Sequence, residues 1–348
     1  MRNLALMVLC VAFLMSLVGL VSAEVEVLGV ESYSGIDAEW GFSASRDGSQ
    51  FTYVDRVLLR SRDVICQLYL VEARTGSKRH VYSAWHIGNF TWVGRDDFYF
   101  AAWDTVDLVD RVKHYKDGVL STVVEGGQYS LSPDGKRIIY RANYTYSERN
   151  ARIYVANIDG SEPRLLTLGH DPSWLRGDLI ALTCAEYDSV KNRWTGSVEL
   201  YDLKGYRVGT LGCGSVPQAS PDKRYLAFHY GCGGSIAPHL AVVDAEDSSL
   251  AVRVLVETRA GWYPVDFSWA PTSDALVFNA DSLSDVSEGE SCYTNLCVVD
   301  LEGNLVEVTP GVRGVFEFAP VWTEAGILFR REGADGSPRQ FRLRVVSK

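Results

Sequence analysis

Ser132–Leu166 reads SPDGKRIIYRANYTYSERNARIYVANIDGSEPRLL and sets the pattern for the rest of the chain. Ser132–Gly135 predicts a tight turn, because Pro presets φ, Asp bonds its own backbone and Gly accepts a positive φ. Arg137–Arg141 is rich in β-branched and aromatic residues, which favours a buried strand. Arg152–Ile158 alternates apolar and polar residues, as a half-buried strand does, and Asn157–Gly160 predicts the next hairpin turn. The stretch therefore predicts an antiparallel unit of short strands.

Versions of this unit recur along the chain. The first turn can be followed through further copies at intervals of about 39 to 53 residues, which is near the period of a four-stranded propeller blade. The residue before the turn repeats as well, and four of its seven occurrences are Trp: Ala44, Trp92, Leu131, Trp174, Ala219, Trp269 and Trp322. We therefore expect this position to be structurally equivalent in every copy.

The repeats predict an all-β fold, since helical periodicity is nearly absent and turns separate the strand-like runs. We predict a seven-bladed β-propeller, with six blades as the alternative because the second repeat is degenerate. Gly314–Lys348 offers only three strands, and Glu24–Tyr33 would supply the fourth and close the ring. Residues 24–348 are thus expected to form a single domain.

The first 23 residues have the composition of a targeting segment. Arg2 gives a positive start, Leu4–Val21 is almost wholly apolar, and Val21–Ala23 offers small residues for cleavage. The apolar run is about long enough to span a bilayer, so a retained membrane anchor is the alternative to a cleaved signal peptide. Either way we expect the body to be exported, whether periplasmic, cell-surface or secreted, and to meet a membrane only through this segment if it is uncleaved.

The repeats resemble the WD40-like (PD40) repeats of TolB-type propellers and of the propellers in prolyl-oligopeptidase-type peptidases. The resemblance is carried by SPDGKRIIY at Ser132–Tyr140 with RIYVANIDGSEPRLLT at Arg152–Thr167, and by SPDKRYLAFHY at Ser220–Tyr230 with HLAVVDAEDSS at His239–Ser249. It implies a propeller, here without the hydrolase domain of the peptidases. A TolB-like chain would be a non-enzymatic scaffold for a protein or peptide partner in the cell envelope.

The longest connections are expected on one face of the ring. Strands of a blade alternate in direction, so the second-to-third loops and the inter-blade connections share a face, which we call the loop-rich rim. Long loops on a rigid scaffold usually carry binding. The predicted loops are Asn143–Asn150, Glu186–Gly196, Gly231–His239 and Asp281–Ser291. Their aromatic residues and those of the connections are the predicted partner-binding residues, with capping of the blade ends as the alternative role: Trp103, Tyr144, Tyr146, Tyr187, Trp194, Trp262 and Tyr263.

Catalytic motifs are missing from the sequence. There is no G-x-S-x-G elbow, and the six histidines form no HExxH or close pair. We therefore expect no enzymatic activity, no metal and no cofactor. The alternative is a propeller enzyme, such as a lyase or glycan hydrolase, with its site at the channel mouth. His86 and His170 are expected in inter-blade connections, from which they could converge near the channel. The net charge of −10 argues against nucleic acid as a partner.

Cysteines and sequons suggest modifications of an exported chain. Six cysteines follow the targeting segment, and an even count in such a chain predicts disulfides, with buried thiols as the alternative. The candidates are Cys66, Cys184, Cys213, Cys232, Cys292 and Cys297. Asn89 and Asn143 head glycosylation sequons, and Asn143 is the better candidate because it falls in a predicted loop.

Overall fold

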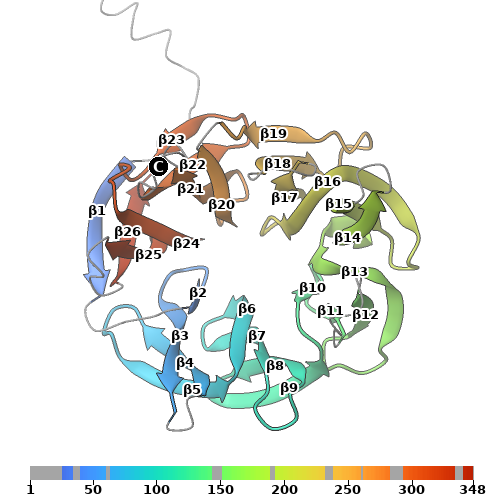
Figure 1. The fold of residues 1–348 in the computed structure, drawn as a ribbon. Coiled ribbons are helices and arrows are strands. Elements are labelled where there is room, and N and C mark those ends of the chain that lie inside the picture. Colours follow the sequence, from blue (N-terminus) through green and yellow to red (C-terminus); the bar gives the residue numbers. More distant parts are fainter. Residues whose placement is uncertain are drawn as a thin grey trace, which may run out of the picture.

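The structure is a computed structural model that describes residues 26–33, 40–59, 63–142, 151–188, 193–231, 238–259, 262–282, 293–333 and 340–347. Strands make up most of these residues, and the helical content of the described ranges is one 3-10 turn at Arg176–Asp178. The all-β prediction is confirmed. Figure 1 shows the strands following one another in a ring around a central axis.

Three of the sheets are simple four-stranded meanders in which each strand pairs with the next. The first contains β2 Trp40–Ala44, β3 Gln50–Leu58, β4 Val64–Glu72 and β5 Lys78–Ala84. The second contains β6 His86–Gly94, β7 Asp97–Trp103, β8 Asp110–Lys116 and β9 Val119–Glu125. The third contains β20 Trp262–Trp269, β21 Ala275–Ser282, β22 Tyr293–Asp300 and β23 Leu305–Glu307.

A ten-stranded sheet runs from β10 to β19. Its strands are β10 Tyr129–Leu131, β11 Arg137–Arg141, β12 Ala151–Asn157, β13 Arg164–Trp174, β14 Ile180–Asp188, β15 Arg193–Tyr201, β16 Arg207–Ala219, β17 Tyr225–Tyr230, β18 His239–Asp244 and β19 Arg253–Val256. It arises because β13 and β16 each serve two repeats. The first half of β13 pairs with β12, and the second half pairs with β14.

This continuity corrects two sequence-based expectations. His170 does not fall in a connection between repeats but lies inside β13, opposite Thr183. A register shift and a positive φ at Asp171 bend the strand there without ending its hydrogen bonding. The expected loop Glu186–Gly196 is likewise mostly strand, because β14 and β15 pair as far as Asp188 opposite Arg193.

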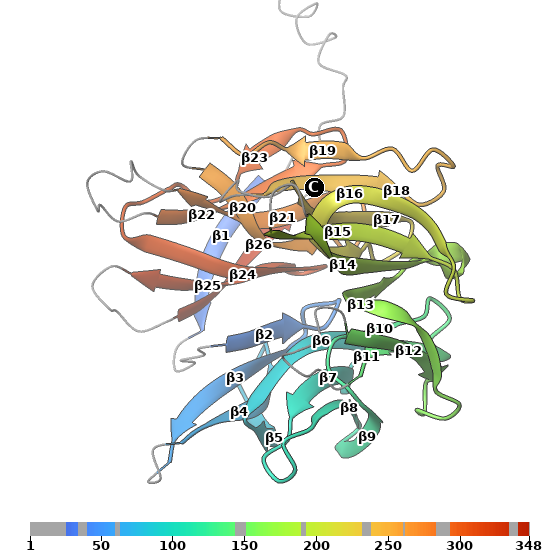
Figure 2. The same ribbon diagram turned by 45° about the vertical axis from the view of Figure 1, so that its right-hand side comes forward.

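The fourth sheet of four strands joins the two ends of the described chain. β1 Glu26–Tyr33 pairs antiparallel with β26 Gln340–Ser347, which continues into β25 Gly326–Gly333 and β24 Val315–Thr323. The sheet order β1-β26-β25-β24 can be followed in Figure 1, and Figure 2 shows the same strands turned by 45°. The three strands expected in Gly314–Lys348 are therefore present, and the residues before the first repeat supply the fourth.

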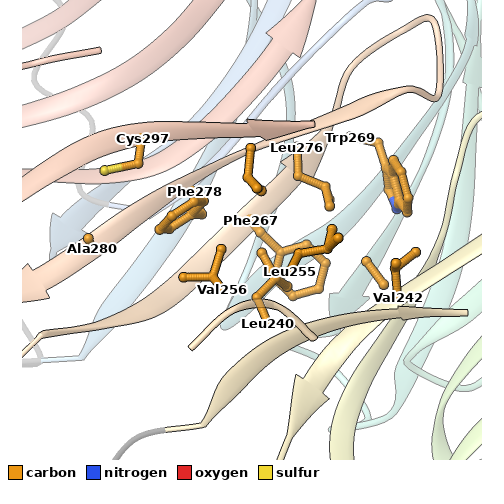
Figure 3. Close-up of a cluster of buried hydrophobic side chains, with 12 residues drawn as sticks. Leu240, Val242, Leu255, Val256, Phe267, Trp269, Leu276, Phe278, Ala280 and Cys297 are labelled. Atoms are coloured by element: carbon orange, nitrogen blue, oxygen red, sulfur yellow. The ribbon is translucent and has the colours of Figure 1, made fainter. Parts of the chain in front are cut away.

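The core lies between neighbouring sheets rather than within one. In Figure 3, Leu240 and Val242 of β18 pack with Phe267 and Trp269 of β20 and with Phe278 of β21. Leu240 and Phe278 are fully buried. Burying each such side chain contributes about 1.5–3 kcal/mol, so adjacent sheets are held mainly by apolar contact. Within the described ranges there is no helix long and apolar enough to cross a membrane.

Candidate functional site

The turn after each first strand is built by the side chains that the sequence repeats. In the copy at Ser132–Gly135, the Ser132 hydroxyl donates to Asp134 Oδ1 at 2.6 Å and accepts from the Arg137 amide at 2.9 Å. Gly135 has φ 67°, the left-handed value that glycine takes without strain. Ser220 and Asp222 make the same hydroxyl-to-carboxylate bond, at 2.5 Å. The predicted turn chemistry is therefore confirmed.

These turns surround a cavity of about 800 Å³. Its lining comes from segments that are far apart in the sequence, so the ring brings them together. The segments are Ser43–Asp47, Phe90–Arg95, Leu131–Gly135 without Asp134, Pro221–Lys223, Trp269 with Pro271, and Trp322 with Glu324. The cavity therefore opens among the tight turns, on the rim opposite the loop-rich rim, and we call it the central cavity.

The repeated position before the turn forms much of the cavity wall. Five of its members line the cavity: Ala44, Trp92, Leu131, Trp269 and Trp322. The indole N–H of Trp269 donates to the Gln218 carbonyl at 3.0 Å, which holds that ring in place. The other members, Trp174 and Ala219, are absent from the lining, and Trp174 is fully buried. Five of the seven residues that occupy this repeated position therefore also lie together in the wall of the central cavity.

A belt of side-chain hydrogen bonds ties neighbouring first strands together behind this wall. Ser173 Oγ accepts from the Ala219 amide at 2.9 Å, and Ser268 Oγ accepts from the Trp322 amide at 3.3 Å. Ser130 Oγ accepts from the Trp174 amide at 3.1 Å in the same way. Each serine stands one residue before the repeated position. A recurring small polar residue there is a signal in the sequence to which we assigned no role.

The charged groups of the lining are mostly engaged with other protein groups. Arg46 Nε lies 2.9 Å from Glu324 Oε1, and its Nη2 donates to the Pro271 carbonyl at 3.3 Å. Arg95 lies 3.0 Å from Glu72. The carboxylate of Asp222 is hydrogen-bonded within its turn, which holds its pKa below the usual value although burial acts in the opposite direction. The walls are thus polar at the turns and apolar at the indoles.

Lys223 is different from the other charged groups. It is half-buried, and within the described part of the chain its ammonium has no hydrogen bond or ion pair. Desolvation by the surrounding protein lowers its pKa below that of an ordinary lysine. Its φ is 64°, which is the glycine region of the turn. The sequence shows this departure as SPDK in place of SPDG, a difference that by itself indicates no function.

The predicted partner-binding aromatics do not line the central cavity. Trp103 ends β7 and is 43% exposed. Trp262 and Tyr263 begin β20 and are half-buried; the Trp262 ring meets Phe278 edge-on, and the Tyr263 hydroxyl donates to Asp281 at 2.9 Å. These two contacts fit the capping role. The backbones of Tyr187 and Trp194 pair across β14 and β15, whereas Tyr144 and Tyr146 lie outside the described residues.

The cysteine prediction is wrong for three of the six candidates. Cys66, Cys184 and Cys297 are buried and keep their thiols, because each lies in a different apolar core between sheets. Burial raises the pKa of Cys297 to about 12. Cys213 is disulfide-bonded, and Cys232 and Cys292 lie outside the described residues.

The structure describes one of the two glycosylation candidates and one further histidine. Asn89 is exposed in β6 with φ 53°, and Asn143 lies outside the described residues. Among the residues that the structure describes, no group of three or more His, Cys, Asp or Glu side chains could hold a metal ion. The histidine expected beside His170, His86, is exposed at the start of β6.

No protein-family model matches the chain, and no curated protein matches it in sequence. Solved structures do match it. The β-propeller domain of the trilobed protease from Pyrococcus furiosus, described as having an open velcro topology, superposes with a TM-score of 0.63 at 10% identity over 88% of this chain and 94% of that one. The fold is a β-propeller.

Two further solved structures match the chain. An oligogalacturonate lyase in complex with manganese matches with a TM-score of 0.62 at 13% identity, over 94% of this chain and 99% of that one. A putative TolB from Agrobacterium tumefaciens matches with a TM-score of 0.48 at 15% identity, over 81% and 98%. At 13% identity, the likeness to the lyase is one of fold, and the same fold carries different functions.

Proposed function

We propose that this protein is an exported, non-enzymatic binding propeller that recognises a protein or peptide partner. We propose seven blades, since β13 and β16 divide the ten-stranded sheet into three, with the last blade completed by β1 beside β26. Export is supported by the composition of residues 1–23. The resemblance to TolB-type repeats supports a partner in the cell envelope.

The central cavity is the observation that carries this proposal. Its volume of about 800 Å³ suits a peptide side chain with its flanking backbone, and it falls within the range of established ligand sites. Trp92, Trp269 and Trp322 offer the aromatic anchors that dominate the binding energy of protein interfaces. The turns beside them supply polar groups that would orient the bound chain.

The groups that line the central cavity are held in place by other protein groups, which supports a binding role for the cavity. The serine belt fixes the first strands to one another, and the Arg46–Glu324 pair ties the turn after β2 to the turn after β24. Because these groups are already held in place, a ligand orders few of them on binding, which leaves more of the contact energy as affinity.

The loop-rich rim remains a second proposed contact surface for the same partner. Trp103 is exposed there and is not engaged in the central cavity. The two rims make different predictions for single substitutions. A partner that enters the cavity depends on Trp322, and a partner that lies across the loops depends on Trp103.

The test is a selection of peptides from a random display library on the immobilised mature chain, followed by affinity measurements on single variants. We expect the selected peptides to lose at least about tenfold in affinity with Trp322→Leu, as for an aromatic anchor, and to be unaffected by Trp103→Leu. Thermal unfolding of both variants controls for loss of fold. The reverse pattern would move the site to the loop-rich rim, and failure to select any peptide would reject the proposal.

An enzyme is the second candidate, and the lyase neighbour favours it because that propeller matches 94% of this chain. The experiment is incubation of the mature chain with Mn²⁺ and oligogalacturonate while the absorbance of an unsaturated product is followed. Turnover that disappears with a chelator would overturn the non-enzymatic proposal. We expect no absorbance change.

A further inference from the structure

The backbone at Lys223 belongs to a turn that two other repeats build with glycine, while a third places Ser273 there at φ 67°. Gly48 and Gly135 have φ 70° and 67°, and Lys223 has φ 64°. A side chain at such a φ is strained, because Cβ crowds the backbone. A lysine at a position suited to glycine is a local conflict of the kind that gathers at functional sites.

The turn holds this lysine firmly in the cavity wall. The Lys223 amide donates to the Ser220 carbonyl at 2.9 Å, and its carbonyl accepts from the Arg176 amide at 2.9 Å. Asp222, the residue before it, donates its amide to Ser273 Oγ at 3.0 Å. The backbone is therefore fixed from three segments, and the side chain is the part of Lys223 left to contact the cavity contents.

The other charged side chains of the described lining are paired within the protein. Arg46 pairs with Glu324, and Arg95 pairs with Glu72. The carboxylates of the lining are also engaged: Asp47 accepts from Ser45 and Ser49, and Asp222 accepts from Ser220 and the Arg224 amide while it lies 3.7 Å from Arg176. Lys223 thus contributes a positive charge that no described carboxylate of the cavity neutralises.

The surroundings of Lys223 also partly shield it from water. Pro221, Trp269 and Pro271 line the same cavity, and desolvation lowers the pKa of the lysine. A partly desolvated cation gains from an anion that shares its site, because charge attraction strengthens as water is excluded. A single ammonium in a cavity that is also lined by indoles suits a singly charged organic group better than a phosphate, which binds best to several donors.

We propose that Lys223 makes the central cavity a receptor for a carboxylate of the bound peptide, either its C-terminal carboxylate or an Asp or Glu side chain. This inference rests on the proposed function and names the chemistry of that site. The ammonium donates a charge-assisted hydrogen bond to the carboxylate oxygen, while the indoles contact the flanking apolar part of the ligand.

The first test uses a small probe and needs no known partner. The mature chain is reductively methylated with ¹³C, which keeps the lysine charges, and the Lys223 signal is assigned by its loss in Lys223→Arg. N-acetyltryptophan is titrated against its neutral amide as the matched control. We expect the acid alone to shift the Lys223 signal saturably. No shift at Lys223, or an equal shift with the amide, overturns the inference.

The second test uses the selected peptides and separates the two sources of carboxylate. Binding is measured for each peptide with a free and with an amidated C-terminus, and with Asp or Glu replaced by Asn or Gln. Loss of the recognised carboxylate should weaken binding by about tenfold or more, as expected for one charge-assisted hydrogen bond. The form that weakens identifies the source, and unchanged binding in every form overturns the inference.

Variants of Lys223 distinguish its charge from its backbone. Lys223→Met keeps the side-chain length without the charge. Lys223→Gly places at this position the residue that the turn prefers. We expect both variants to fold. Both should abolish discrimination between acid and amide, whereas Lys136→Gln, in the residue after the turn at Ser132–Gly135, should not. Peptides that bind through Trp322 but ignore Lys223→Met would overturn this inference and leave the proposed function standing.

Discussion

Glu317 offers the sharpest stability prediction, because it bonds to three other segments, two of them through its buried carboxylate and one through its backbone. It lies in β24 with its side chain 2% exposed. Arg331 of β25 donates to Oε1 through Nε at 2.8 Å and also through Nη2, and the Thr309 hydroxyl donates to Oε2. The Thr294 hydroxyl of β22 donates to the Glu317 carbonyl at 2.8 Å. Two neighbouring sheets therefore meet at this residue.

The expected cost follows from this burial. Removing one partner of a buried ion pair leaves an uncompensated charge and typically costs about 3–5 kcal/mol. Arg331 is 24% exposed, so water can partly solvate its charge in Glu317→Leu, and we expect about 3 kcal/mol there. Arg331→Leu strands the more buried carboxylate and should cost more, about 4–5 kcal/mol. A domain is stable by only about 5–15 kcal/mol, so either loss is large.

The assay is urea unfolding followed by tryptophan fluorescence, with both single variants and the double Leu variant. The double variant removes both charges and should recover most of the loss, because an apolar pair can replace a buried ion pair. The matched control is Arg46→Leu, whose partner Glu324 is 55% exposed and which should cost less than about 1 kcal/mol. A cost for Glu317→Leu no greater than for this control would refute the reasoning.

Three further predictions concern the turn, the belt and acid stability. Lys223→Gly should raise the free energy of unfolding by up to about 1 kcal/mol, because relief of the left-handed strain slightly exceeds the backbone entropy that glycine loses. Ser173→Ala should cost about 1–3 kcal/mol, since the Ala219 amide loses its acceptor. Burial lowers the pKa of His229 below 6.5, so the unfolded chain binds a proton that the folded chain excludes, and stability should fall as the pH drops below about 6.5. His229→Phe should reduce that pH dependence.

Each of these predictions has a contradicting result, and the belt prediction also has a matched control. For the belt, the control is Ser161→Ala, which removes an exposed hydroxyl and should change the free energy of unfolding by less than about 0.5 kcal/mol. If Ser173→Ala lost no more stability than this control, the belt would not contribute to stability. A lower urea midpoint for Lys223→Gly would show that the lysine is not strained. Identical pH profiles for the parent and His229→Phe would show that His229 does not govern acid sensitivity. The charge of Asp266 nearby raises the pKa of His229 and so acts against the effect of burial.

The repeats could be predicted from the sequence because their turns are held by the side chains of the turn residues themselves. The Ser132–Gly135 turn is held by its own Ser and Asp, so its residues alone are enough to predict it. The repeated Trp position is likewise visible as spacing. The predicted place of β1 also follows from counting strands, because the last repeat lacks one.

Features set by long-range geometry could not be predicted in the same way. The continuity of β13 depends on a bend at Asp171 with a positive φ, which no composition signals. The thiol state of Cys184 depends on which core surrounds it, not on its spacing. Loop length pointed to the loop-rich rim, whereas the central cavity is made by short turns that only the ring brings together.

Photo-crosslinking of a bound peptide tests the central claim most directly. A selected peptide carrying a diazirine is bound to the mature chain, irradiated, and the modified residues are mapped by mass spectrometry. We predict modification in the turns that line the central cavity, at 131–135, 221–223 and 269–271. Modification confined to 103–110, 257–259 and 262–263, on the loop-rich rim, would contradict the account.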